Sequence, residues 1–325
     1  MRDILKTLHP IVKCVFWFSI FLIMTSLSFF TALFWVSTFQ GHHFDGLEIF
    51  SEFLSDLDQP GAVLANKTTT ALNQLIAFLG SALVFVVVFG RKTVNNFWLR
   101  RPVTTIALVP LLGITIMPVI QLTVKINEWL IPSGGTLERI FKPLEEQAAE
   151  LTEKMLVMEG TGDLIFNVLL VGVVPAICEE FAFRGVLQSQ LSKAFGNVHV
   201  GIWVSAILFS AIHLQFYGFL PRMILGAFFG YLLIWTGSIW APILAHLTNN
   251  AVGVIAYYAY QGDDALADQT LEDASIEAIP FITLSVIFIL GVYMLIRRSV
   301  WQDIKPAYLH WKRPGDAVLG EHRLN

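Results

Sequence analysis

Long apolar stretches, separated by short polar connections, run along most of the chain. An α-helix needs about 20 consecutive, mainly apolar residues to cross the hydrocarbon core of a bilayer, and the stretches are of this order. Backbone groups find no partners in lipid, so a helix that satisfies them internally is the expected structure of each stretch. The pattern predicts an all-α, polytopic membrane helical bundle of about eight transmembrane helices, near residues 11–39, 72–90, 103–124, 164–183, 199–217, 219–236, 239–260 and 279–296.

The polar connections differ in charge from one side of the predicted bundle to the other. One group is basic and contains Arg2, Lys6, Lys13, Arg91, Lys92, Arg100, Arg101, Arg297, Arg298, Lys305, Lys312 and Arg313. The other is acidic and contains Asp45, Glu48, Glu52, Asp56, Asp58, Asp263, Asp264, Asp268, Glu272, Asp273 and Glu277. Short cytoplasmic connections are enriched in Lys and Arg, so with eight spans both termini are predicted to be cytoplasmic.

The composition agrees with this class. The chain is 55% hydrophobic and 14% charged, with a mean hydropathy of +0.64, which is outside the range of soluble globular proteins. Cys14 and Cys178 both lie in apolar stretches, so we expect neither a disulfide framework nor a thiolate metal cluster. The first span lacks a cleavage site of small residues and is interpreted as a permanent anchor. We expect an integral protein of a bacterial inner membrane, with membrane lipid but no nucleic acid as a partner.

Three regions are predicted within one integral domain. Residues 1–163 contain the first three spans and an outward amphipathic segment. This segment is residues 125–160, which are expected to lie on the membrane surface. Residues 164–260 hold the next four spans and form the candidate catalytic core. Residues 261–325 hold the last span and a basic tail. No internal repeat is visible, whereas many transporters are built from inverted repeats.

Several polar residues interrupt the apolar stretches of the predicted core. They are Glu179, Glu180, Arg184, His213, His246 and Asn250. Ionisable side chains within membrane spans are costly, usually face the interior of a bundle or a wet cavity, and are functional by default. These six residues are therefore the candidates for a functional site.

The turn at Gly196-Asn197 predicts how two of these residues meet. Glu179 lies 17 residues before Gly196 and His213 lies 17 residues after it. In a pair of antiparallel helices, equal distances from the turn mean equal height, so Glu179 and His213 are expected to face each other. His246 is eight residues beyond the next turn at Ser238 and would reach a similar depth, on the cytoplasmic side.

Helical spacing predicts a division of labour between the two glutamates. Residues four apart on a helix are neighbours, whereas adjacent residues are not. Glu180 and Arg184 are therefore expected to form an ion pair, which leaves Glu179 without a partner nearby in the sequence. A carboxylate and an imidazole can together activate water, and an imidazole and an amide can stabilise an oxyanion. The set suits hydrolysis of an amide bond by water.

Three motifs resemble those of the CPBP intramembrane proteases, a family that includes the type II CAAX prenyl endopeptidases and the bacteriocin-processing (Abi) proteins. Glu179-Glu180-Phe181-Ala182-Phe183-Arg184 matches E-E-x-x-x-R, Phe209 to His213 matches F-x-x-x-H, and His246 to Asn250 matches H-x-x-x-N. The resemblance covers about residues 164–260. It implies an eight-span helical fold with a cavity open to the cytoplasm, and an endopeptidase acting on a hydrophobic or membrane-tethered peptide.

The resemblance also implies roles for individual residues. Glu179 and His213 would activate the water, and His246 and Asn250 would stabilise the oxyanion, supported by Glu180, Arg184 and Phe209. Family members are often described as metalloproteases, although the eukaryotic-type members resemble glutamate-dependent enzymes without a metal. No cofactor is firmly implied. If a metal is used, Glu179, His213 and His246 are the candidate ligands of a zinc ion.

Each candidate also has a purely structural interpretation. A backbone carbonyl could satisfy His213, and His246 could compensate a kink at Pro242. Asn250 could join two helices by a hydrogen bond. Two other functions remain open at this point, namely a proton-coupled transporter that uses the buried Glu and His as a relay, and a catalytically idle membrane scaffold or immunity protein.

Overall fold

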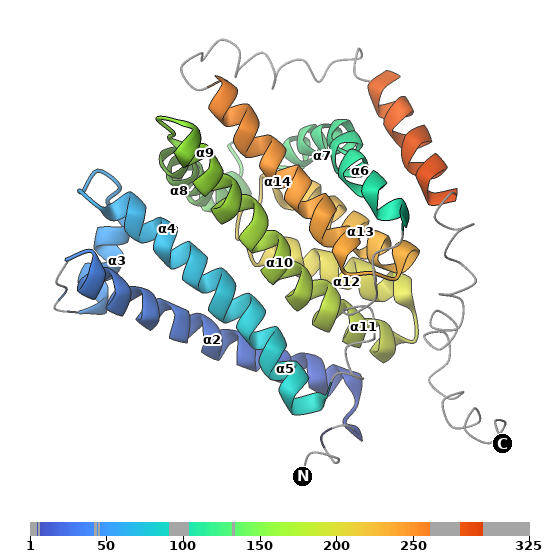
Figure 1. Ribbon diagram of the computed structural model, residues 1–325, viewed down its shortest axis with the longest axis horizontal. Coiled ribbons are helices and arrows are strands. Elements are labelled where there is room, and N and C mark those ends of the chain that lie inside the picture. The colour runs from blue at the N-terminus through green and yellow to red at the C-terminus, as the bar shows by residue number, and fades with distance from the viewer. Residues whose placement is uncertain are drawn as a thin grey trace.

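A computed structural model of the chain describes residues 5, 7–41, 44, 46–90, 104–131, 134–260 and 280–294 (Figure 1). The described residues form helices, and no strand occurs among them. Each of the eight predicted segments contains a helix. The prediction of an all-α membrane bundle is therefore confirmed.

The first two predicted spans form a pair of long helices. Helix α2 spans Pro10–Phe39. The second helix is continuous from Ala62 to Phe89 and consists of α4 (Ala62–Asn73), the π-helical η1 (Gln74–Gly80) and α5 (Ser81–Phe89). It begins ten residues before the predicted span because its first turns are polar and give no hydropathy signal. Between the two helices lies a short helix that was not predicted, α3 (Leu47–Ser55), which buries Phe50 and Phe53.

The fourth predicted span is part of one 35-residue helix, Thr161–Phe195, which we call the long helix. Its segments are α9 (Thr161–Asn167), η5 (Val168–Val173), α10 (Val174–Glu180), η6 (Phe181–Leu187) and α11 (Gln188–Phe195). Segments η5 and η6 are π-helical. Gly196 ends the helix in a left-handed conformation with φ of 59°, which glycine adopts without steric cost. The predicted long helix and its turn at Gly196 are confirmed.

The next three helices complete the predicted core. Helix α12 (Val198–Ala211) begins at Asn197, whose side chain accepts hydrogen bonds from two backbone N–H groups of its first turn. It is followed by α13 (Phe219–Thr236) and α14 (Trp240–Tyr260). The predicted span 199–217 is too long, because α12 ends at Ala211 and the chain then turns.

The remaining helices flank this core. The third predicted span is bent into η4 (Thr104–Leu108), α6 (Val109–Thr115) and α7 (Met117–Leu130). Pro110 and Pro118 lie at the beginnings of α6 and α7, where proline is tolerated. Helix α8 (Thr136–Leu156) occupies the predicted amphipathic segment. A further helix, Pro280–Met294, lies in the last predicted span.

Five helices among the described residues are long and apolar enough to cross a membrane. They are Pro10–Phe39, Ala62–Phe89, Ile106–Leu130, Thr161–Phe195 and Phe219–Thr236. Val198–Ala211 and Pro280–Met294 are apolar but shorter. The count of eight spans thus stays a prediction. The prediction of cytoplasmic termini also stays open, because most of the basic and acidic connections, including residues 91–103, 261–279 and 295–325, lie outside the described residues.

Helix α2, the α4–α5 helix, the long helix and α14 lie side by side, with α12 and α13 packed across the far side of the long helix and α14 in the view of Figure 1. Glycines allow α11, α12 and α13 to approach closely. A Cβ on Gly201 of α12 would lie 2.6 Å from the backbone nitrogen of Ser192 in α11, and a Cβ on Gly230 of α13 would lie 2.7 Å from Gln188 Oε1. Small residues play this part at many helix interfaces in membranes.

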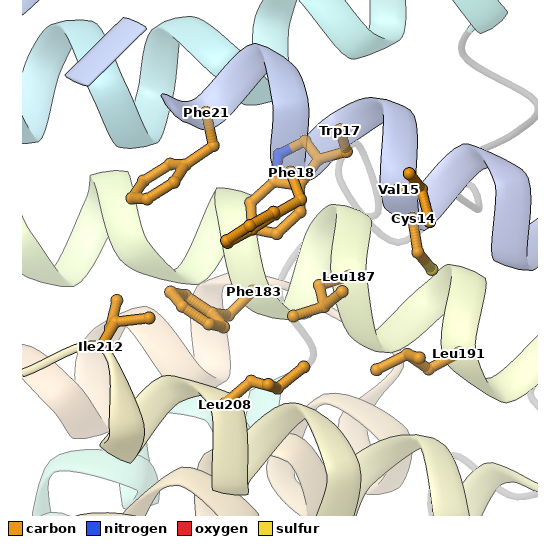
Figure 2. A pocket seen from close by; sticks show the side chains of 10 residues that line it. All are labelled: Cys14, Val15, Trp17, Phe18, Phe21, Phe183, Leu187, Leu191, Leu208 and Ile212. Atoms are coloured by element: carbon orange, nitrogen blue, oxygen red, sulfur yellow. The ribbon is translucent and has the colours of Figure 1, made fainter. Parts of the chain in front are cut away.

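An apolar groove of about 300 Å³ lies between α2, the long helix and α12 (Figure 2). Its lining consists of Cys14, Val15, Trp17, Phe18, Phe21, Phe183, Leu187, Leu191, Leu208 and Ile212. Several of these side chains belong to one buried apolar cluster, which joins α2, the α4–α5 helix, the long helix and α12. The groove therefore borders the core that fixes the long helix against the first two helices.

Candidate active site

A polar cavity of about 370 Å³ lies between the long helix, α12, α13 and α14. Glu179, His213, His246 and Asn250 all line it. The other lining residues are Val171, Pro175, Phe209, Gly218, Pro221, Arg222, Leu225, Phe229 and Asn249. The four residues predicted to be catalytic thus meet in one cavity, although three separate parts of the chain supply them.

The predicted ion pair of Glu180 and Arg184 is present and is buried. Arg184 Nη1 donates to Glu180 Oε1 at 2.8 Å, and both side chains are almost inaccessible to solvent. Arg184 Nη2 donates to the carbonyl of Gly226 in α13 at 3.0 Å. The guanidinium carbon lies 4.6 Å from the ring centroid of Phe209 and 5.5 Å from that of Phe229. Arg184 therefore ties the long helix to α12 and α13.

Glu180 has a second partner that the sequence did not predict. Its Oε1 accepts a hydrogen bond from His246 Nδ1 at 2.9 Å, and the ring of His246 stacks on Phe229 with a centroid distance of 5.1 Å. The carboxylate thus fixes the orientation of the imidazole, as carboxylates commonly do for functional histidines. His246 binds Glu180 of the long helix, whereas the structural interpretation had assigned it to a kink at Pro242.

Glu179 is held from two sides by residues far away in the sequence. Gln74 Nε2, at the beginning of η1, donates to Glu179 Oε1 at 2.8 Å. On the other side, His246 Nε2 lies 3.9 Å from Glu179 Oε2. Among the described residues, no hydrogen bond or ion pair joins Glu179 to His213, although both line the cavity. The carboxylate thus has one oxygen engaged by an amide and the other near an imidazole.

His213 lies two residues beyond the end of α12, in a turn. Its Nδ1 is 2.8 Å from the carbonyl oxygen of Phe209, and since a carbonyl only accepts, Nδ1 carries the proton. In the neutral ring Nε2 is then an acceptor. Leu214, the next residue, has a φ of 57°, a left-handed value that is unusual for a residue other than glycine. Such strained positions often occur at functional sites.

Asn127 of α7 holds the turn that follows His213. Its side-chain amide donates to the carbonyls of Phe216 and Tyr217, both at 2.8 Å, and its oxygen accepts from the backbone N–H of Leu220 at 3.0 Å. Phe216 also stacks on Phe141 of α8, with ring centroids 3.8 Å apart. The position of His213 thus depends on α7 and α8, both of which precede the predicted core.

Asn250 joins α14 to the long helix. Its Nδ2 donates to the carbonyl of Val171 at 2.9 Å. Pro175, four residues after Val171, has no N–H with which to bond this carbonyl, so Asn250 supplies a donor at that point. This contact is a hydrogen bond between two helices, as the purely structural interpretation of Asn250 expects. It uses one N–H of the amide and leaves the second for another acceptor.

The candidate metal ligands were tested by their arrangement. No group of three His, Cys, Asp or Glu side chains within the described part of the chain is placed to hold a metal ion. Glu179, His213 and His246, as they are arranged here, therefore do not fit a zinc site.

Sequence reasoning missed two polar residues of the site, Gln74 and Arg222. Both lie within predicted spans, at the edge of an apolar run. The argument that singled out Glu179 and His246, a polar side chain inside a span, applies to them equally. The three matched motifs contain neither residue, so the resemblance gave no signal for them.

Comparisons with known proteins match the part of the chain that contains this site. The family described as type II CAAX prenyl endopeptidase Rce1-like matches residues 161–252. An uncharacterised protein of Bacillus subtilis, YpbD, is 28% identical over 106 residues, which are 31% of this chain and 49% of that protein. The membrane-embedded CAAX protease MroQ of Staphylococcus aureus is 25% identical over 191 residues, which are 56% of this chain and 72% of that protein.

The matches cover only parts of the proteins that were compared. The chain spans about half the length of the Bacillus subtilis protein, and no solved structure gave a significant match. The matched segment nevertheless contains all three motifs and the four cavity residues named above. Residues 161–252 are therefore similar to the type II CAAX prenyl endopeptidase Rce1-like family, and the segment that carries the candidate site is the segment that matches.

Proposed function

We propose that the protein is an intramembrane endopeptidase that hydrolyses a peptide bond by water activated at Glu179. The observation that carries the proposal is the convergence of Glu179, His213, His246 and Asn250 in one cavity. The match to a CAAX-protease family supports a membrane endopeptidase in general. The residues, their roles and the class of substrate are our proposals.

The carboxylate of Glu179 acts as the general base. Gln74 occupies Oε1, so Oε2 is the oxygen that takes a proton from water. The unprotonated Nε2 of His213 accepts the second hydrogen of this water and orients its lone pair towards the substrate carbonyl. The hydroxide equivalent attacks the carbonyl carbon to form a tetrahedral intermediate. Glu179 then returns its proton to the leaving amine as the C–N bond breaks.

His246 and Asn250 stabilise the negative oxygen of that intermediate. Asn250 has one N–H left after its bond to Val171. His246 donates from Nε2, which requires a ring protonated at both nitrogens because Nδ1 already donates to Glu180. The carboxylates of Glu180 and Glu179 flank this ring at 2.9 Å and 3.9 Å. Preorganised donors of this kind are often the largest single contribution to catalysis.

The substrate is a hydrophobic or membrane-tethered peptide, because the cavity lies between helices of a membrane bundle. Segment α10, which carries Glu179, lies inside the membrane-length long helix. A soluble globular substrate would have to unfold to reach it. A peptide attached to the membrane is already beside the helices that line the cavity.

The test is cleavage of a pool of hydrophobic peptides by the purified full-length chain in liposomes, followed by mass spectrometry. Glu179→Gln keeps the shape of the side chain and removes the base, so cleavage should fall by a factor of about 10² to 10⁴. Cleavage by the His213→Ala variant should fall by a similar factor. The matched control is Glu150→Gln, the same change at an exposed residue of α8 that pairs with Lys154, and it should cleave as the wild type does.

Three outcomes would overturn the proposal. Cleavage that persists in both Glu179→Gln and His213→Ala would exclude the mechanism. Proton flux across the liposomes that depends on Glu179, without any cleavage, would favour a transporter instead. A chain that folds, binds a partner and neither cleaves nor transports would be a membrane scaffold.

A further inference from the structure

Arg222 lines the polar cavity, and the proposed mechanism does not use it. It lies in the first turn of α13 and lines the same cavity as Glu179. Among the described residues its guanidinium group donates to Gln215 alone, from Nη1 to the backbone carbonyl at 3.3 Å and from Nη2 to the side-chain oxygen at 2.7 Å. A guanidinium group has five N–H donors, so more than half of them are not used by the described residues.

No carboxylate neutralises Arg222 at close range. Among the described residues no acidic oxygen lies within 4.0 Å of its guanidinium group, and it interacts with Glu145 and Glu179 only at longer range. The positive end of the α13 dipole also lies at this first turn, where a cation is unfavourable. The fold thus keeps a partly buried positive charge that, among the described residues, has no carboxylate in contact with it.

The backbone beside Arg222 makes room for its side chain. A Cβ on Gly218 would lie 2.9 Å from Arg222 Nη2, which is too close for an ordinary contact. Any larger residue at position 218 would therefore displace the guanidinium group. Gly218 lines the cavity as well, so the turn, Gln215 and the glycine together hold the charge at the cavity wall.

Arg184 shows what an arginine with a structural role looks like in this protein. It is 2% exposed, it pairs with Glu180, it donates to a backbone carbonyl of α13 and it lies between two aromatic rings. Arg222 has neither a close carboxylate nor a ring over its guanidinium group within the described part of the chain. The difference indicates that Arg222 is available for a partner that enters the cavity.

We propose that Arg222 binds a carboxylate of the bound peptide. This contact positions over Glu179 the peptide bond that lies at a fixed distance from the carboxylate. A guanidinium fork matches a carboxylate in a bidentate geometry. The carboxylate has two possible sources, the C-terminus of the peptide or an Asp or Glu side chain. The positioning of the peptide bond for cleavage rests on the proposed function. The binding of the carboxylate can be tested without any cleavage.

The test measures binding to the full-length Glu179→Gln chain in detergent. The probes are three pools of short synthetic peptides of random sequence, quantified by mass spectrometry. One pool has free C-terminal carboxylates and no acidic side chains, one has C-terminal amides and no acidic side chains, and one has C-terminal amides and a single Asp or Glu. A charge-assisted hydrogen-bonded contact should enrich one or both carboxylate pools over the uncharged pool by about 10- to 100-fold.

Substitutions of Arg222 then decide whether the enrichment comes from this side chain. Arg222→Met should remove it, so that all pools bind alike, and Arg222→Lys should retain a part, because lysine keeps the charge but not the fork. A purely structural role would weaken the three pools equally. Thermal unfolding checks that the variants fold, and if Arg222→Met does not fold, Arg222→Lys and Gln215→Leu are compared instead.

The inference is wrong if the pools bind equally to the arginine-containing chain, if none of them binds, or if the enrichment survives Arg222→Met. Failure of the proposed function has a different signature. If the wild-type chain binds the carboxylate pools selectively but cleaves none of them, the carboxylate site stands and the endopeptidase does not.

Discussion

The polar cavity and the apolar groove are similar in size, at about 370 Å³ and about 300 Å³, but opposite in chemistry. Both are lined by one row of side chains on the long helix, spaced four residues apart. The cavity takes Val171, Pro175 and Glu179, and the groove takes Phe183, Leu187 and Leu191. One helix therefore serves both spaces, with α2 and α12 as the other walls of the groove and α12, α13 and α14 as the other walls of the cavity.

The boundary between the two spaces is aromatic. Phe183, the first groove residue of the row, contacts Phe209 edge to face, with ring centroids 5.1 Å apart. Helix α12 ends at the same boundary, where Ile212 lines the groove and His213 lines the cavity. Substitutions on the cavity side should thus change catalysis or leave a charge unpaired, and those on the groove side should change packing alone.

The largest effect on stability is expected on the cavity side, from Arg184→Met. It leaves the buried carboxylate of Glu180 without its cation, which costs about 3–5 kcal/mol when one partner of a buried pair is removed. Chemical denaturation in detergent measures the free energy of unfolding. The double variant Glu180→Gln with Arg184→Met should recover much of the loss, and a single variant as stable as the wild type would contradict the arrangement.

The matching change on the groove side is Leu187→Ala. The side chain is 5% exposed, and its truncation should cost about 2 kcal/mol, at the low end for a buried leucine because the groove already adjoins it. The rate of peptide cleavage should stay unchanged. Leu169→Ala, at a half-exposed position of the same helix, is the control for stability. A large loss of kcat in Leu187→Ala would mean that the two spaces do not function separately.

A smaller effect is expected from Gln74→Leu. The substitution removes the hydrogen bond to Glu179 Oε1, and a hydrogen bond to a charged group contributes about 1.5–3 kcal/mol. Cleavage should slow, mainly through kcat, because Glu179 loses the contact that holds its orientation. The neighbouring Asn73, whose oxygen accepts from Ser28 of α2, provides the control Asn73→Leu. If both variants slow cleavage equally, Gln74 acts through the helix packing alone.

The smallest effect is expected from a strong chelator. Since Glu179, His213 and His246 are not arranged as three ligands of one metal ion, cleavage should continue at the same rate after treatment with the chelator. The control is a zinc-dependent peptidase treated in parallel. Loss of activity that returns on addition of Zn²⁺ would contradict the prediction and would require the two imidazoles to reorient.

The sequence predicted the helices of the core well, because apolar runs and turn residues are local signals. Gly196 and Asn197 mark the end of one helix and the start of the next by their own conformational preferences. In contrast, α3 is a helix of nine residues within an acidic connection, and the burial of Phe50 and Phe53 against its neighbours stabilises it. Short helices that depend on tertiary packing leave little periodic signal.

The site shows the same division between local and distant information. The pair of Glu180 and Arg184 follows from helical spacing and was predicted. The hydrogen bond from Gln74 to Glu179 joins residues 105 positions apart, and spacing carries no information about it. The contact of His246 with Glu180 also depends on how α14 packs against the long helix. Pairings between helices were therefore open until the packing was known.

The π-helical segments of the long helix have a consequence for this row of side chains. In an α-helix, residues four apart form a row that is inclined to the axis and slowly leaves the face on which it began. A π-helical turn contains more residues, so η5 and η6 rotate the row in the opposite sense and reduce this drift between Val171 and Leu191. A single-residue deletion in η6 would remove that correction. It would turn Leu191 away from the groove and leave Glu179 where it is, so the length of this helix is constrained to the residue.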